Sequence, residues 1–273
     1  MQRIPTHVSP PGRPSASIPL DCVPALNEVP EVAREARRSW GVGPTSRLNV
    51  ERICKRLEIE VAIVSLGVPD GGAQGFLLPR TDGRFLIEVD PEPRNGWPDV
   101  APPLRASLRR HRQRFLIAHE LAHTLFYEGP SGGRRLVMDS PCQELFCDEL
   151  ARALLIPPEV AAELPLTPEG VVEIQRRFDV SMELALRGAV AAHGDSGAAW
   201  LLLHRDEKTL IQWTSAHRSL TSRALHALRK LAARAAREGC AVAGVIAPHR
   251  RARALYLPRR EQVIVTWEQC VAG

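Results

Sequence analysis

Long hydrophobic runs are absent from this sequence. No stretch approaches the roughly 18 uninterrupted apolar residues that a membrane-spanning helix needs. Residues 1–30 are polar and rich in proline, and they lack the apolar centre of a secretory signal peptide. We therefore expect a chain with no membrane partner, and the cytoplasm is its default compartment.

Paired cysteines are absent as well. The six cysteines are scattered along the chain and form no Cys-x-x-Cys pair. In a chain without an export signal we expect reduced thiols, mostly in core positions. No cysteine is therefore predicted to bind a metal.

Lysine is scarce, because only three of the 36 basic residues are Lys and 36 − 3 = 33 are Arg. The other proportions are those of a globular protein, with 44% hydrophobic and 25% charged residues, and they exclude a collagen, a coiled coil and a disordered chain. The formal net charge of +5 is only a weak indication of a nucleic-acid or acidic partner, since arginine richness can also reflect genome composition.

Changes in composition and in the spacing of hydrophobic residues divide the 273 residues into four parts. The first part has many prolines and few apolar residues to pack, which is typical of a flexible segment. We predict an α+β chain with a flexible leader at 1–27, a mixed core domain at 28–165, a helical segment at 166–195 and a small α/β domain at 196–273.

Local signals predict the elements of the core domain. Helices at 29–40 and 49–57 precede a strand at 59–64. Two further strands, at 75–78 and 84–89, flank turn residues and form a hairpin.

The next stretch is expected to begin as a loop. Its prolines predict a loop at 91–104, after which a basic run at 105–114 leads into an apolar helix at 114–127. A further helix begins with the capping-box spacing of Ser140 and Gln143.

The rest of the chain is predicted to hold a helix pair and a strand-rich block. The pair occupies 168–177 and 182–192, with Thr167 and Ser181 as caps, and it resembles a helix-turn-helix. A basic helix at 222–238 divides the block. The predicted strands of the block are 199–203, 209–213, 241–246, 254–257 and 262–267.

The segment His119-Glu120-Leu121-Ala122-His123 carries the most specific chemistry. Two histidines four residues apart lie on one helix face and can bind one metal ion, most often Zn²⁺. Glu120 can take a proton, as general base, from a water whose pKa the metal lowers toward roughly 7. The alternative is an exposed surface helix, which is disfavoured because this helix is apolar on nearly every side.

A catalytic zinc ion needs a third protein ligand. Glu144 lies 144 − 123 = 21 residues after His123, in the first turn of the next predicted helix. Asp148 follows on the same face and could accept a hydrogen bond from a ligand histidine. The alternative for Glu144 is a first-turn glutamate that the helix dipole stabilises. Asp139 and Glu128 are weaker candidates, because both lie in the intervening loop region.

These two helices resemble those of the ImmA/IrrE family of metallopeptidases. The resemblance rests on Arg-Phe-Leu-Ile-Ala-His-Glu-Leu-Ala-His at 114–123 and on Glu-Leu-Phe-Cys-Asp-Glu-Leu-Ala-Arg-Ala-Leu-Leu-Ile-Pro at 144–157. It extends over roughly residues 29–195. Asp148 stands where family members often carry Asn, and an aspartate here is similar to that of thermolysin-like zincins, where it orients a ligand histidine.

The resemblance implies a minimal zincin-like fold for 28–165, with His119, His123 and Glu144 as metal ligands and Glu120 as general base. It implies one Zn²⁺ per chain, with another divalent metal such as Mn²⁺ as the alternative. It also implies that the chain cleaves a helix-turn-helix transcriptional repressor, which switches on stress-response or mobile-element genes.

Some roles stay open. Tyr127 could help to polarise a scissile carbonyl or could be an aromatic cap at the helix end. Arg114 has either a structural role or a contact with substrate. In the helix pair, the second helix offers only Arg187 as a basic side chain, so nucleic acid is not the expected partner. The C-terminal domain weakly resembles a GAF-like sensor in its order of elements, and its basic residues suit a solvated surface better than a binding surface.

The predicted function is therefore a zinc-dependent endopeptidase that acts on a regulator protein. The alternative is a DNA-binding or sensor regulator in which the metal site is structural or inactive. The presence of Glu120 favours the enzyme, because a purely structural metal site has no use for a general base.

Overall fold

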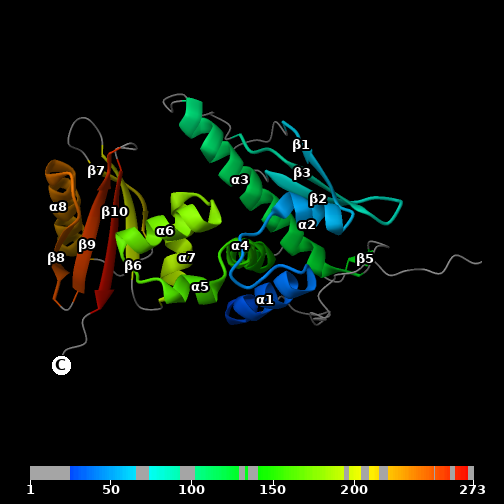
Figure 1. Ribbon diagram of the computed structural model, residues 1–273, viewed down its shortest axis with the longest axis horizontal. Coiled ribbons are helices and arrows are strands. Elements are labelled where there is room, and N and C mark those ends of the chain that lie inside the picture. The colour runs from blue at the N-terminus through cyan, green and yellow to red at the C-terminus, as the bar shows by residue number, and fades with distance from the viewer. Residues whose placement is uncertain are drawn as a thin grey trace, which may run out of the picture. The chain divides into compact units, whose positions relative to one another are not determined.

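The computed structural model divides into two compact units, Met1–Pro157 and Pro158–Gly273, and each mixes helices with β-sheet (Figure 1). This mixture fits the predicted α+β class. The predicted leader falls almost entirely outside the described residues, and the predicted boundaries after residues 165 and 195 stay predictions. The described residues are 25–65, 74–92, 102–128, 133–134, 141–193, 197–203, 209–214, 221–248, 250–258 and 262–269.

The first unit opens with helical elements at the predicted places. A 3-10 turn, η1 (Leu26–Glu28), leads into helices α1 (Val29–Ser39) and α2 (Val50–Arg56). Asn49 caps α2 as predicted, because its side chain accepts a hydrogen bond from the backbone N–H of Arg52 at 2.8 Å.

A three-stranded sheet follows, formed by β1 (Glu60–Ile63), β2 (Gly75–Pro79) and β3 (Phe85–Val89) in the order β1-β3-β2. β1 runs parallel to β3, and β2 pairs antiparallel with β3, which confirms the predicted hairpin. Gly83 adopts φ 82° in the connecting turn, a conformation that glycine reaches without strain. β2 is an edge strand, since β3 is its one strand neighbour within the described residues.

Helix α3 (Pro102–His123) begins earlier and ends earlier than predicted. The basic run was expected to lead into the helix but forms part of its first half, and residues 102–104, predicted as loop, are helical. Proline is compatible with a first helical turn, where the N–H has no intrahelical partner, and arginine and leucine are good helix formers. After His123 the chain passes through a 3-10 turn, η2 (Thr124–Phe126), into the short strand β4 (Tyr127–Glu128), which pairs with β5 (Gly133–Arg134).

The length of α3, 22 residues, would allow it to cross a membrane, but its first half is strongly charged. No helix in the described ranges is long and apolar enough to span a bilayer.

Helix α4 (Pro141–Leu155) packs against α3 and α1 and completes the core of the first unit. Its cap, predicted at Ser140, lies outside the described residues. Phe146 of α4 meets Phe126 edge to face, with ring centroids 5.9 Å apart. Leu150 and Leu121 are also fully buried in this core, which holds the two helices that carry the predicted site together.

In the second unit, three helices come first: α5 (Pro158–Glu163), α6 (Pro168–Phe178) and α7 (Met182–Ala192). Thr167 and Ser181 cap α6 and α7 as predicted, since each side chain accepts a backbone N–H three residues ahead. α5 was not predicted, because the two prolines after α4 were taken to end helical structure. The second of them instead occupies the first position of a new helix.

A five-stranded antiparallel sheet in the order β7-β6-β10-β9-β8 is the centre of the second unit. α8 lies on one face of this sheet, and α6 and α7 lie on the other (Figure 1). All five strands overlap the predicted ones. Their bounds are β6 (Gly197–Leu203), β7 (Thr209–Thr214), β8 (Val242–Ala247), β9 (Arg250–Leu257) and β10 (Gln262–Gln269).

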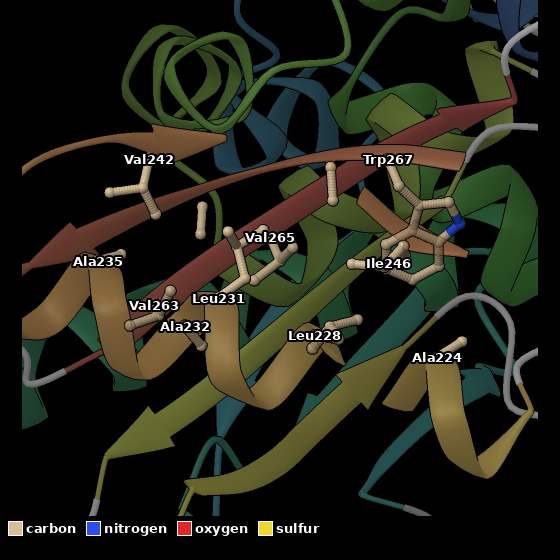
Figure 2. Close-up of a cluster of buried hydrophobic side chains, with 12 residues drawn as sticks. Ala224, Leu228, Leu231, Ala232, Ala235, Val242, Ile246, Val263, Val265 and Trp267 are labelled. Carbon is tan, nitrogen blue, oxygen red and sulfur yellow. The ribbon is translucent and has the colours of Figure 1, made fainter. Parts of the chain in front are cut away.

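Helix α8 (Ser222–Glu238) has the predicted bounds. The Thr221 side chain caps its start, and Gly239 ends it in the left-handed conformation at φ 65°. Its apolar face packs on the sheet, where Leu228 and Leu231 face Val265 and neighbouring strand residues (Figure 2).

The buried position of Leu150 predicts a large stability effect. Leu150→Ala should lower the free energy of unfolding by about 2–5 kcal/mol, because it leaves a cavity in the packed core beside α4. Urea denaturation followed by circular dichroism measures the change. The matched control is Leu145→Ala on the same helix, where the side chain is 49% exposed and the change should stay below about 1 kcal/mol. Equal losses of unfolding free energy in Leu150→Ala and Leu145→Ala would contradict the burial of Leu150 in the core.

Candidate metal centre

Helix α3 presents the two histidines of the motif side by side. His119 and His123 lie one turn apart, and their Nε2 atoms face each other at 3.0 Å. The ring centroids are 4.8 Å apart. His123 is buried, and the side chain of His119 is 13% exposed. Two ring nitrogens at this distance need a shared proton or a shared cation, since their lone pairs would otherwise repel.

Glu144 reaches the same point from α4. Its Oε2 lies 3.3 Å from Nε2 of His119, and its Oε1 lies 3.5 Å from Nε2 of His123. Four ligands in tetrahedral array at about 2.0–2.1 Å from a metal are about 3.3 Å apart. The three side chains therefore converge at the spacing that one metal ion requires. They form the one such group of His, Cys, Asp or Glu found within the described residues.

Asp148 fixes the orientation of His119. Its Oδ1 lies 2.9 Å from Nδ1 of His119, so the carboxylate can accept a hydrogen bond from Nδ1–H, which leaves the lone pair of Nε2 available to a metal. This is the contact predicted from the four-residue spacing of Glu144 and Asp148. It has the form of a carboxylate–histidine pair at a metal site.

Gln143 is a site residue that sequence reasoning missed. It was predicted only as part of a capping box, but its amide is buried and faces Nδ1 of His123 at 3.4 Å. The two ends of an amide are interchangeable by rotation, so its carbonyl can accept a hydrogen bond from the Nδ1–H group of His123. The position just before Glu144 was the one available signal, and it did not indicate which way the side chain would point.

The charges of the cluster favour a cation. Burial lowers the pKa of His119, but hydrogen bonds to Asp148 and Glu144 outweigh it and raise that pKa to about 9. The hydrogen bond with His119 holds the pKa of Glu144 below its ordinary value, although burial opposes this. Two carboxylates thus stabilise positive charge at His119, and a bound metal ion would supply that charge in place of a proton.

Glu120 lies next to this cluster in a drier environment. It is buried, and its pKa rises from 4.5 to about 7 because burial disfavours the charged form, against the opposing effect of His119. Gly75, the first residue of β2, packs against its carboxylate. A Cβ on Gly75 would lie 2.6 Å from Oε1 of Glu120, so only glycine leaves the carboxylate where it is. The predicted role of Gly75 was only that of a hairpin strand residue.

Arg114 and Tyr127, whose roles the sequence left open, contact Leu48 and Phe85 respectively. Arg114 is buried and donates a hydrogen bond to the carbonyl of Leu48 at 2.9 Å, which ties α3 to the segment before α2. Tyr127 is buried at the start of β4, directly after the 3-10 turn η2, and its ring meets Phe85 edge to face at 5.1 Å. These contacts do not decide between the roles left open by the sequence.

Cys147 is close to the cluster in sequence but unsuited to it. The side chain is buried, and burial together with the charges of Glu144, Glu120 and Asp148 raises the pKa of the thiol far above its ordinary range. A metal ligand must be a thiolate, so this environment disfavours Cys147 as a ligand. The donor set is thus two imidazoles and one carboxylate, which suits Zn²⁺ and related divalent metals.

Residues 104–189 match the family model of peptidase M78, described as the IrrE N-terminal-like domain. The matched segment begins in α3, ends in α7 and contains His119, Glu120, His123, Glu144 and Asp148. The predicted resemblance to ImmA/IrrE metallopeptidases is confirmed for this segment. The part of the resemblance upstream of residue 104 lies outside the match, and no curated protein matches the chain.

The contact of Gln143 with His123 predicts an effect on metal affinity. Gln143→Leu keeps the volume of the side chain but removes the acceptor for Nδ1, so the affinity for Zn²⁺ should fall about 10- to 100-fold. Competition with a chromophoric chelator measures the change without any substrate. Gln175→Leu, the same substitution in α6, serves as control and should leave the affinity unchanged. Equal affinity for parent and Gln143→Leu would reduce Gln143 to a packing residue.

Proposed function

We propose that this chain, which carries an IrrE N-terminal-like domain at residues 104–189, is a zinc-dependent endopeptidase. The observation that supports the proposal is the convergence of His119, His123 and Glu144 beside the buried carboxylate of Glu120. The first three suit a catalytic zinc site, which has three protein ligands and leaves one position for water or substrate. Glu120 supplies the base that such a site needs.

The proposed mechanism divides two tasks between the metal and the protein. A zinc ion would supply a Lewis acid that polarises the scissile carbonyl and acidifies a water molecule. Glu120 would accept a proton from that water at its carboxylate and deliver it to the leaving amine. Asp148 would keep the lone pair of His119 directed at the metal throughout.

The edge strand β2 offers a place for the peptide. β3 is its only strand partner in the described part of the chain, so the outer edge of β2 can pair with an extended peptide. Gly75 lies at the start of this strand, against Glu120. A peptide that pairs with β2 would therefore lie with its backbone close to the general base.

The proposed substrate is a helix-turn-helix transcriptional repressor. Its cleavage in the cytoplasm would switch on stress-response or mobile-element genes. The resemblance to ImmA/IrrE metallopeptidases supports this substrate class. The second unit would add a regulatory function, and its five-stranded antiparallel sheet with a helix layer on each face supports the GAF-like sensor proposal.

The alternative, a sequence-specific DNA-binding regulator that uses the helix pair α6–α7, has less support. Six of the eleven residues of α7 are buried, so few of its side chains could reach base edges. Its one basic side chain, Arg187, is paired with Glu183 at 2.8 Å.

The general base is the most direct test of the enzymatic proposal. Glu120→Gln keeps the shape of the side chain but cannot accept the proton, so cleavage should fall at least about a hundredfold while zinc stoichiometry stays at one per chain. The assay is co-expression with a helix-turn-helix repressor encoded beside the chain, followed by mass spectrometry of the fragments. Cleavage at the parental rate would contradict the mechanism.

Gly75→Ala provides an independent arm of the same test. The new methyl group would displace the carboxylate of Glu120 without touching a metal ligand, so cleavage should fall while zinc affinity is retained. The control is Gly239→Asn at the end of α8, where an added Cβ meets no neighbour and asparagine tolerates the left-handed conformation. Unchanged cleavage in Gly75→Ala would mean that Glu120 does not act from its position against β2.

A further inference from the structure

Helix α8 carries a dense group of basic side chains. The helix contains five Arg or Lys residues and one Glu, a formal charge of 5 − 1 = +4, while the whole chain has +5. A residue at every third or fourth position shares a helix face. The cationic face, as we define it, consists of Arg223, Arg229, Lys230, Arg234 and Arg237.

Most of the cationic face is unpaired within the described ranges. Arg223, Arg229, Lys230 and Arg237 are exposed, and they form no hydrogen bond or ion pair within the part of the chain that the structure describes. Arg234 is the exception, since it pairs with Glu238 at 3.2 Å. Some exposed arginines elsewhere in the unit are neutralised locally, as Arg176 is by Glu173 and Arg187 by Glu183. The cationic face therefore keeps a net field that a polyanion would feel.

The opposite face of α8 is apolar and packs on the sheet of the second unit. Leu228 and Leu231 are buried against strands of the sheet, in the cluster that Figure 2 shows. An amphipathic helix binds a membrane by inserting its apolar face, and here that face is not accessible. The cationic face can therefore bind a partner only through its charged and polar groups.

The cationic face also lacks the features of a protein-binding surface. The exposed residues of α8 are all polar. The centres of protein interfaces are depleted in charge and are built around buried aromatic or aliphatic anchors, none of which is present on this face. A partner that carries regularly spaced charge fits the surface better than a folded protein does.

We infer that the cationic face of α8 binds the phosphate backbone of duplex nucleic acid without reading its sequence. From Arg223 to Arg237 the face extends 14 residues, or about 21 Å along the helix axis. That length covers about six phosphates of one strand, which are spaced about 3.4 Å apart along the duplex axis. Arginine suits this role, because its guanidinium group can form two parallel hydrogen bonds with a phosphate. The inference is independent of the metal site.

The salt dependence of binding tests the inference. The full chain should bind a labelled 24-base-pair DNA duplex of arbitrary sequence, as measured by fluorescence anisotropy. The slope of log affinity against log salt should be about −3.6, or 0.9 for each of the four unpaired cations. Arg223→Gln combined with Lys230→Gln should weaken binding roughly tenfold in 50 mM salt and reduce the slope to about −1.8.

The control is a matched removal of two charges on the other face of the sheet. Arg251 and Arg253 of β9 are exposed, and they alternate with Ala252 and Ala254, which face α8. Arg251→Gln combined with Arg253→Gln should change affinity less than twofold and leave the slope unchanged. An equal loss in both double variants would show a response to net charge alone and would overturn the inference.

Two further outcomes would also overturn it. One is the absence of duplex binding in 50 mM salt. The other is tighter binding to vesicles with anionic lipid, or to polyglutamate, than to the duplex in the same buffer. Circular dichroism of both double variants should match that of the parent, because all four substituted side chains are exposed.

Discussion

The packing of α3 on α4 is the contact on which the candidate metal centre depends. Neither helix holds the site alone, because His119 and His123 come from α3, whereas Glu144 comes from α4. Apolar packing fixes how the two helices lie together, and Phe126, in the 3-10 turn directly after α3, meets Phe146 of α4. Because protein interiors are close-packed, this separation is fixed to within small shifts. The core packing therefore places the carboxylate oxygens of Glu144 at 3.3 Å from Nε2 of His119 and at 3.5 Å from Nε2 of His123.

The same packing produces the electrostatic conflict that a metal ion would resolve. Glu120 and His123 are buried, and Glu144 lies against both histidines. Burial of such groups is costly unless they are paired. A divalent cation would bind the ring nitrogens and the carboxylate together, and it would replace the proton that the two carboxylates now stabilise on His119. Asp148 and Gln143 would not touch the metal ion; each lies against the Nδ1 atom of one histidine and would orient that ring.

Sequence reasoning succeeded where the determinant is local. The caps at Asn49, Thr167 and Ser181 were predictable because each side chain bonds a backbone N–H only three residues further along the chain. The positions of the histidine pair and of Asp148 follow from the four-residue spacing that places side chains on one helix face. It failed where distant segments meet. Nothing near Gly75 in sequence indicates that it packs on Glu120, and Gln143 could equally have been a capping residue. The start of α3 was misplaced because prolines were treated as loop formers, although they also suit a first helical turn.

Two imidazoles and a carboxylate, with no sulfur ligand, are the proposed donors to zinc. X-ray absorption at the zinc edge of the zinc-loaded chain tests this donor set most directly, because the zinc–ligand distances separate nitrogen and oxygen from sulfur. We expect only nitrogen and oxygen atoms bound to zinc, at about 2.0–2.1 Å, with the outer scattering of two imidazole rings. A sulfur shell at about 2.3 Å, which would bring Cys147 or Cys142 into the site, would contradict this donor set.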